Sequence, residues 1–511
     1  MSAADGLFAT RAGGVLLHPT SLPGPHGIGD IGPQAASWME WMVKAGLRVW
    51  QVLPLGPTGY GDSPYQSFSA FAGNPLLISP DLLVQEGLFR DSDLEPLPLT
   101  DPSRVDFGKV LAYKERLLRI SAQHFEEGAA PHLREPFESF QQEGEGWLED
   151  FSLFMALKNG YGGAPWTTWG ASLARRERQA LEEAGHSLAG EVNFHRFQQF
   201  LFHRQWHDLR RQAAQNGVSL VGDVPIFVSH DSADVWANPS LFEMDAGGNP
   251  TVVAGVPPDY FSPTGQRWGN PLYRWQAMED EGFSWWIRRF RSLLKLVDVV
   301  RLDHFRGFDA YWEIPASAPT AETGRWLAAP GNKLLSACRD ALASLPIIAE
   351  DLGVITPSVV SLRDSFQLPG MKVLQFSFAG DPEEDFLPHN YPRHCVVYTG
   401  THDNDTSRGW YEKASDEDRD FCRRYLARDG VDIAWDLIRA AWSSVALWAV
   451  APLQDFLDLG SEGRMNYPGR TEGNWQWRAE EAHLTDALAE RIREMSVLYG
   501  RYPLDLPEEP S

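Results

Sequence analysis

Residues 298–303 read Asp-Val-Val-Arg-Leu-Asp, a short apolar run that ends in charged side chains. A run of this length, rich in Val and bounded by turn residues, is typical of a strand that is buried on both faces. Further runs of the same kind occur from one end of the chain to the other. Together they lie at residues 14–18, 48–55, 218–228, 298–303, 346–350, 371–376, 395–399 and 446–457.

Helical patterns separate several of these runs. Apolar residues recur at helical spacing in four segments, and Thr356-Pro357 is typical of a helix start, with an N-cap residue followed by Pro at the first helical position. The four segments are 34–45, 194–216, 284–296 and 332–345. Apolar strands that alternate with helices indicate a parallel sheet, and eight such strands indicate a closed (β/α)8 TIM barrel. We therefore expect one catalytic barrel over residues 12–500.

The spacing of the expected strands is uneven. About 160 residues separate the second strand from the third and about 70 separate the third from the fourth, more than one helix requires. We expect the surplus, residues 70–195 and 229–283, to form subdomains inserted in βα loops. Such loops emerge at the C-terminal face of a barrel, where active sites lie. Residues 504–511 are expected to be a tail.

Composition excludes several classes of protein. The chain has 511 residues, of which 43% are hydrophobic, and a formal charge of −24. The length and the hydrophobic fraction exclude a disordered chain. The negative charge argues against nucleic acid and anionic membrane surfaces as partners. Cys338, Cys395 and Cys422 are sparse and form no CxxC motif. The sequence also has no signal-like start and no long apolar run. These features and the sparse cysteines predict a soluble cytoplasmic protein.

Aromatic residues are unusually frequent, with 20 Trp against 14 Tyr. Several Trp residues lie in turn-like contexts, Trp166 and Trp169 among them. They could form a face on which flat ligands stack, and filling of a large core is an equally good interpretation.

Polar side chains follow the expected strands at their carboxyl ends, where a barrel carries its chemistry. Four carboxylates, an arginine and a histidine stand out from a sequence that offers no HExxH motif, no clustered His/Cys ligands and no nucleophile-elbow serine. The residues concerned are Asp223, Arg301, Asp303, Glu350, His402 and Asp403.

Arg301 and Asp303 lie two apart on one strand, so their side chains project to the same face. The guanidinium is expected to lower the pKa of Asp303 and keep it ionised, which suits a nucleophile. Glu350 follows three apolar residues, and nearby carboxylates would raise its pKa, as a general acid requires. Two carboxyls of opposite pKa shift indicate glycoside cleavage, with retention of configuration if they lie about 5–5.5 Å apart. A purely structural Arg301–Asp303 pair is the alternative interpretation.

The motifs around these residues resemble those of a known family. Asp223-Val-Pro, Arg301-Leu-Asp303-His304, Glu350-Asp351-Leu and Thr401-His402-Asp403 are similar, in that order, to four short regions of the α-amylase clan. Five flanking stretches resemble the amylomaltases, which are 4-α-glucanotransferases acting on maltodextrins. They are His18-Pro-Thr-Ser-Leu-Pro-Gly, Gly61-Asp-Ser-Pro-Tyr65, Gly255-Val-Pro-Pro-Asp259-Tyr260-Phe261, Gly265-Gln-Arg-Trp268-Gly and Arg464-Met-Asn466-Tyr-Pro-Gly.

The resemblance covers residues 12–478 and implies roles for individual residues. Asp303 would be the nucleophile, Glu350 the general acid/base, and Asp403 the carboxylate that stabilises the transition state. Arg301 and His402 would support them. Asp223, Asp259 and four residues in turn-like contexts would contact sugar, although structural turns explain those four equally well: Asp62, Ser63, Tyr65 and Asn466.

Residues 255–271 combine Pro, Gly and aromatic side chains. They are too rigid for a flexible linker and are expected to be too polar for a strand. We interpret them as a lid that lays Tyr260, Phe261 and Trp268 over a glucan and keeps water out, which favours transfer over hydrolysis. A rigid cap over the barrel mouth is the alternative.

The sequence therefore predicts a retaining 4-α-glucanotransferase of α-1,4-glucans such as maltodextrins and amylose, with possible cyclic products. It predicts no organic cofactor and no metal, and it leaves the oligomeric state open. A hydrolase of the same clan would share the carboxylates. Two further functions stay open at this point, a non-catalytic glucan-binding protein and a metal-dependent barrel hydrolase.

Overall fold

The computed structural model describes residues 8, 10–90, 93–95, 97, 101–144, 146–258, 262–470 and 472–502. Its centre is a closed barrel with the strand order β1-β12-β11-β10-β9-β6-β3-β2. The strands are β1 (Ala12–Leu16), β2 (Val49–Gln51), β3 (Ser219–Pro225), β6 (Val299–Asp303), β9 (Ile347–Ala349), β10 (Gly370–Val373), β11 (Cys395–Tyr398) and β12 (Trp448–Pro452). The predicted (β/α)8 barrel is confirmed.

All neighbouring barrel strands pair in parallel, so their carboxyl ends meet at one face. The pairing of β3 with β6 sets Asp223 beside Arg301 and Pro225 beside Asp303. This register places the predicted polar residues of two strands side by side at the barrel mouth.

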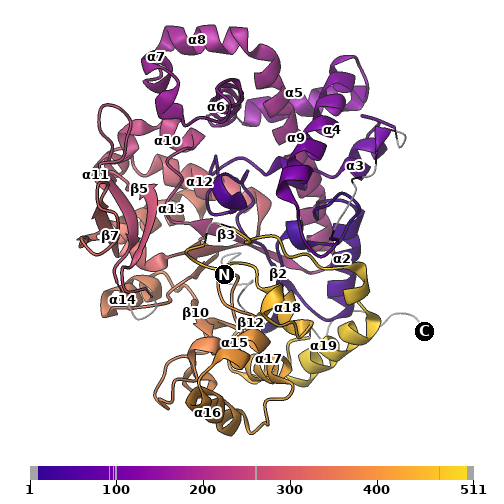
Figure 1. The fold of residues 1–511 in the computed structure, drawn as a ribbon, viewed down its shortest axis with the longest axis vertical. Helices are drawn as coiled ribbons and strands as arrows, with labels where there is room; N and C mark the ends of the chain where they lie inside the picture. The colour runs from indigo at the N-terminus through magenta and orange to yellow at the C-terminus, as the bar shows by residue number, and fades with distance from the viewer. Residues whose placement is uncertain are drawn as a thin grey trace.

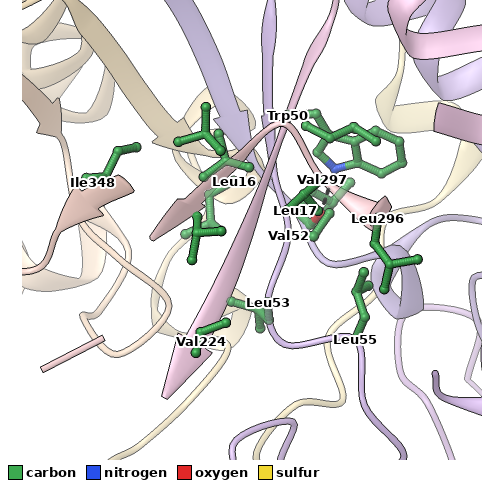
Figure 2. Close-up of a cluster of buried hydrophobic side chains, with 14 of the residues drawn as sticks. Leu16, Leu17, Trp50, Val52, Leu53, Leu55, Val224, Leu296, Val297 and Ile348 are labelled. Carbon is green, nitrogen blue, oxygen red and sulfur yellow. Dashed lines mark hydrogen bonds between the residues drawn. The ribbon is translucent and has the colours of Figure 1, made fainter. Parts of the chain in front are cut away.

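Apolar side chains on the barrel strands hold the sheet together. Leu16, Trp50, Val224 and Ile348 come from β1, β2, β3 and β9 and are all buried within the cluster that Figure 2 shows. The indole N–H of Trp50 donates to the carbonyl of Leu17 at 2.8 Å, so even the polar atom of this ring is satisfied. Burial on both faces explains why these runs lack a polar/apolar alternation.

Helices surround the barrel and connect its strands. The expected helices are confirmed, with small differences at their ends. Those around the barrel are α2 (Pro33–Lys44), α9 (Ala189–Gln215), α12 (Ser284–Leu296), α13 (Gly331–Leu342), α14 (Pro357–Ser365), α15 (Ser407–Lys413), α16 (Asp416–Leu426), α17 (Ile433–Ser443), α18 (Leu453–Phe456) and α19 (Asp486–Leu498).

A helical region lies between β2 and β3 and occupies the upper part of Figure 1. It consists of α3 (Pro80–Gln85), α4 (Phe107–Glu126), α5 (Arg134–Glu143), α6 (Leu148–Gly160), α7 (Ala171–Ala174) and α8 (Arg178–Ser187). Lys114 of α4 anchors it to the barrel loops, because its ammonium donates to Asp30 Oδ2 at 2.8 Å and to the Ile78 carbonyl at 2.7 Å while fully buried.

A second, four-stranded antiparallel sheet lies beside the barrel, on the left of Figure 1. Its order is β5-β4-β7-β8, from β4 (Val252–Val256), β5 (Gln266–Pro271), β7 (Ala310–Pro315) and β8 (Arg325–Ala328). The short helices α10 (Ala233–Ala237) and α11 (Trp275–Asp280) flank the β4–β5 hairpin in the chain.

The expectation that residues 255–271 are too polar for a strand is wrong. Both ends of this stretch belong to strands, which pair with a register shift between Val253 and Gly255. An antiparallel hairpin exposed on one face does not need the apolar residues of a buried strand. Gly255 permits the close pairing, since a Cβ there would lie 2.1 Å from the Gln266 carbonyl oxygen.

Most of the tryptophans fill the core. Trp166 and Trp169, which occur in turn-like sequence contexts, are 2% and 1% exposed. Core packing is therefore the correct interpretation for these two rings. Trp326 on β8 is an exception at 38% exposed.

A buried arginine, Arg501, forms hydrogen bonds at the junction between the first and last barrel strands. Arg501 Nη1 donates to the carbonyls of Ala12 at 3.2 Å and Leu447 at 2.9 Å, and its Nε donates to the carbonyl of Trp442 at 2.9 Å. Burial, and then the nearby Arg11, lower the pKa of Arg501 to about 9. The side chain thus joins β1, the residue before β12 and the end of α17.

Candidate active site

The predicted strand-end residues converge at the C-terminal mouth of the barrel. Asp223 and Arg301 lie inside β3 and β6, and Asp303 is the last residue of β6. Glu350 follows the last residue of β9, and Asp403 lies five residues beyond the end of β11. Parallel pairing brings these ends together because every strand points the same way.

Arg301 links two of the carboxylates. Its Nη1 donates to Asp223 Oδ1 at 2.8 Å, to Asp223 Oδ2 at 2.7 Å and to Asp303 Oδ1 at 2.9 Å. The side chains of Arg301 and Asp223 are 4% and 0% exposed, whereas that of Asp303 is 29% exposed. Asp303 is therefore the carboxylate of this trio that is open to the mouth.

Burial affects the two inner groups in opposite ways. It raises the pKa of Asp223, and the Arg301 guanidinium only partly offsets this rise. Burial would lower the pKa of Arg301, but Asp223 and then Asp303 raise it well above its ordinary value. Arg301 thus remains a permanent cation at the base of the site.

A second group of contacts surrounds Asp403. His402 Nε2 lies 3.3 Å from Asp403 Oδ2, and Asn466 Nδ2 donates to Asp403 Oδ1 at 2.6 Å. Burial in the mouth would raise the pKa of Asp403, but His402 and Asn466 bring it below its usual range. Asp403 is therefore ionised, and half of its side chain stays exposed.

Tyr65 connects the two groups. Its hydroxyl donates to Asp223 Oδ2 at 2.7 Å and lies 3.3 Å from His402 Nδ1. The Tyr65 and His402 rings also stack, with centroids 4.9 Å apart and an interplanar angle of 21°. Asp403, His402, Tyr65, Asp223 and Arg301 thus form one continuous chain of contacts that ends at Asp303.

Glu350 is held by backbone donors. The amide of His304 donates to Glu350 Oε2 at 2.6 Å, and that of Leu352 donates to Oε1 at 3.2 Å. His304 directs its amide this way from a left-handed conformation, with φ 53° and ψ 50°. Burial first, and then the charge of Asp303, raise the pKa of Glu350 well above its ordinary value. The site thus combines a buried carboxyl of raised pKa, Glu350, with the exposed carboxylate of Asp303.

The predicted lid reaches this side of the mouth. Trp268 of β5 meets the ring of His304 edge-on, with centroids 4.9 Å apart and an interplanar angle of 89°. The ring therefore lies next to the residue that follows Asp303. The other predicted lid residues, Tyr260 and Phe261, and the predicted sugar contact Asp259 lie outside the described residues.

Asp62 and Ser63 precede Tyr65 in the turn after β2. Asp62 ends the short 3-10 helix Tyr60–Asp62 with φ 57°, and burial raises its pKa. Ser63 Oγ accepts a hydrogen bond from the Tyr65 amide at 3.3 Å. Both residues therefore shape the turn that presents Tyr65 to the carboxylates.

Sequence reasoning missed two residues at the site. Arg464 Nη2 donates to the Asp403 carbonyl at 2.6 Å, and Arg464 Nε donates to the Asn466 carbonyl at 2.7 Å. Trp475, with φ 63°, lies 6.0 Å from His402 and 5.8 Å from Tyr65 between ring centroids. Arg464 could have been predicted, because it lies in the same motif as Asn466. For Trp475 the sequence offers no signal beyond its turn-like context.

The described residues contain no group of three or more His, Cys, Asp or Glu side chains arranged as a metal site. Within the same residues, no helix is long and apolar enough to cross a membrane.

Comparisons with known proteins show the family of the chain. The family model described as 4-alpha-glucanotransferase matches residues 17–485. A 4-alpha-glucanotransferase of Thermus thermophilus is 55% identical over 494 residues, covering 95% of this chain and 98% of the relative. Another, from Synechocystis sp., is 48% identical over 497 residues, covering 96% and 98%.

Solved structures give the same result. The amylomaltase from Streptococcus agalactiae in complex with acarbose superposes with a TM-score of 0.93 at 38% identity, covering 96% of this chain and all of that one. With a family model and close relatives that span nearly its full length, the chain belongs to the 4-alpha-glucanotransferase family.

Proposed function

We propose that this enzyme transfers α-1,4-glucan segments between maltodextrins by double displacement, with Asp303 as nucleophile, Glu350 as general acid/base and Asp403 as the charge that stabilises the transition state. The observation that carries the proposal is the presence of two different carboxyl groups in one site. Asp303 is exposed and bonded to Arg301, whereas burial and the charge of Asp303 strongly raise the pKa of Glu350. These are the two roles that a retaining mechanism needs.

In the first step, Asp303 attacks the anomeric carbon of the donor while Glu350 gives its proton to the glycosidic oxygen. The C–O bond breaks with its electron pair on that oxygen, and the shortened glucan leaves with the proton. A covalent ester joins the donor sugar to Asp303. Asp403 is ionised and half exposed, so it offers negative charge to the oxocarbenium-like transition state and acceptor oxygens to sugar hydroxyls.

In the second step, Glu350 acts as base and removes a proton from the hydroxyl of an acceptor sugar. The oxygen attacks the anomeric carbon and releases Asp303, so one α-1,4 bond replaces the one that was broken. The competing acceptor is water. We infer that the hairpin carrying Trp268 disfavours water there, with Tyr260 and Phe261 as further lid residues, since the Trp268 ring abuts His304 beside Asp303. Asp259 in the same segment is proposed as a sugar contact.

We further propose that Tyr65, His402 and Asn466 hold the donor sugar, with Asp62 and Ser63 shaping their edge of the site. Asp223 was also predicted to contact sugar, but its side chain is 0% exposed and is bonded to Arg301 and Tyr65, so it positions those two residues instead. The regions around 70–195 and 229–283 are proposed as inserted subdomains on the barrel of residues 12–500. The three cysteines are buried free thiols, which supports a reducing compartment such as the cytoplasm.

The experiment that tests the proposal counts reducing ends during digestion of maltotriose. Hydrolysis of one α-1,4 bond creates one new reducing end, whereas transfer leaves the number unchanged. We expect glucose and glucans longer than maltotriose to appear together while total reducing ends stay nearly constant. A rise in reducing ends that matches substrate consumption would instead identify a hydrolase.

A further inference from the structure

The protons in the contact chain between Asp403 and Asp223 can be counted. Asp403 is ionised, so its Oδ2 can only accept, and the nearby His402 Nε2 must carry a hydrogen. Burial and Asp223 raise the pKa of Tyr65 well above its ordinary value, so its hydroxyl retains its single hydrogen.

That hydroxyl has two neighbours and can donate to only one of them. Asp223 Oδ2 is 2.7 Å away and charged, whereas His402 Nδ1 is 3.3 Å away. A hydrogen bond to a charged acceptor is the stronger one, so the Tyr65 hydrogen points to Asp223. The contact between Tyr65 and His402 Nδ1 is then satisfied only if Nδ1 carries a hydrogen and donates it to the Tyr65 oxygen.

We propose that His402 is an imidazolium in the resting enzyme, and that Tyr65 is the positioning residue that holds its second proton by giving its own hydrogen to Asp223. The charge of His402 is a property of the free enzyme and does not depend on the proposed function. Only its effect on catalysis rests on that function.

The charges on the other sides of His402 are consistent with this assignment. Burial would lower the pKa of His402, but Asp403 beside it leaves the value above the ordinary one, while Arg301 and Asp223 oppose each other. His18, packed behind it, stays neutral: its Nδ1 accepts from the Leu53 amide at 3.2 Å, and burial and His402 lower its pKa to about 3.

Two further charged groups line the small cavity shared by His18 and His402. Asp405 forms an ion pair with Lys413, with 2.5 Å between Oδ2 and Nζ. Arg464 lies 4.0 Å from the same Asp405 oxygen and donates to the Asp403 carbonyl. Both groups are thus engaged with other partners, and Asp403 is the anion that pairs with the His402 ring.

The second proton changes the charge balance of the mouth. With His402 charged, the anions Asp223, Asp303 and Asp403 face two cations, Arg301 and His402, and one negative charge remains to stabilise the oxocarbenium-like transition state. Loss of the His402 proton would leave two negative charges and would free the Tyr65 hydroxyl to turn toward His402 and away from Asp223. The hydrogen bond that Tyr65 donates thus couples the protonation of His402, beside Asp403, to the Arg301–Asp223 ion pair next to Asp303.

The test is a titration of histidine ring 15N signals in the full-length enzyme. Comparison with His402→Asn identifies the His402 signals. In the wild type we expect both ring nitrogens of His402 to be protonated at pH 7.5, where an ordinary histidine with a pKa near 6.5 is mostly neutral. In Tyr65→Phe we expect the titration to move down by at least one pH unit, leaving a neutral ring with its hydrogen on Nε2.

Tyr398→Phe is the matched control. It removes another buried barrel hydroxyl, which donates to Gln51 Oε1 at 2.7 Å, and should leave the His402 titration in place. A neutral His402 in the wild type at pH 7.5 would overturn the proposal, even if Tyr65→Phe fails to fold. So would an unchanged titration in a folded Tyr65→Phe. Hydrolysis of maltotriose in place of transfer would overturn the proposed function and leave this result untouched.

Discussion

Replacing Arg301 by Met tests the arrangement of charges beside Asp303. The change removes the cation that donates to both oxygens of Asp223, whose side chain is 0% exposed. Removing one partner of a buried ion pair costs about 3–5 kcal/mol, because the remaining charge is left without compensation. With an unfolding entropy of about 2.1 cal/mol/K per residue, a chain of 511 residues should lose about 3–5 °C in Tm.

The loss should depend on pH in a defined direction. Burial already raises the pKa of Asp223, and Arg301 is the largest influence that opposes this rise, so without it only the weaker effects of His402 and Tyr65 remain. A carboxyl whose pKa is raised in the folded state binds its proton more tightly there, so the stability cost is absent below the unfolded pKa and grows as pH rises from the unfolded pKa to the folded one. The Tm deficit of Arg301→Met should therefore be small near pH 4, close to the unfolded pKa of about 3.9, and reach its full size near pH 7.

Thermal unfolding of wild type and variant at both pH values measures this. Arg325→Met is the control, because Arg325 pairs with Glu313 at 2.6 Å but is 71% exposed, and such pairs contribute less than about 1 kcal/mol. Adding Asp223→Asn to Arg301→Met should restore part of the Tm at pH 7. An equal Tm deficit at pH 4 and pH 7 would refute the reasoning, since an uncompensated carboxylate could not then be its cause.

Four further predictions concern the reaction. Asp303→Asn should abolish turnover while Tm stays near that of the wild type, because a near-isosteric amide cannot form the covalent ester; substantial residual activity in a preparation free of other glucanases would contradict the nucleophile assignment. Glu350→Gln should accumulate an adduct on an Asp303 peptide, seen by mass spectrometry, from an activated donor whose leaving group needs no proton, and absence of the adduct would mean that the two roles are misassigned. Trp268→Ala should keep part of the cleavage rate but raise the yield of reducing ends from maltotriose, because the ring beside His304 no longer keeps water out; an unchanged partition would remove the hairpin as its cause. EDTA should leave the rate unchanged, because the oxygens of Asp223 and Asp403 already accept hydrogen bonds from protein groups, and a calcium-reversible loss would show otherwise.

The barrel and the residues at its strand ends could be predicted because each depends on a local pattern. A short apolar run such as 298–303 identifies a strand, and parallel pairing then fixes where the polar residues after it must lie. The same logic located Asp223, Arg301, Asp303 and Glu350 before any contact between them was known.

The remaining features depend on contacts between distant segments. The antiparallel sheet combines β4 and β5 from before β6 with β7 and β8 from after it, and its exposed hairpin carries no apolar pattern that would predict it. Arg464 and Trp475 reach Asp403 and His402 from loops more than sixty residues further along the chain. The left-handed turn at His304, which aims its amide at Glu350, involves a residue type with no strong preference for that conformation.

The closure of β1 on β12, fastened by Arg501, also has a consequence for synthesis on the ribosome. Leu16 pairs with Pro452, so the first strand cannot complete its ladder until more than four hundred further residues have been made. At about 5–20 residues per second, the nascent chain waits roughly 20–90 s with one edge of β1 open. The emerging chain therefore carries an apolar strand with one unpaired edge for most of its translation, and premature termination before residue 448 leaves that edge available to chaperones and to other nascent chains.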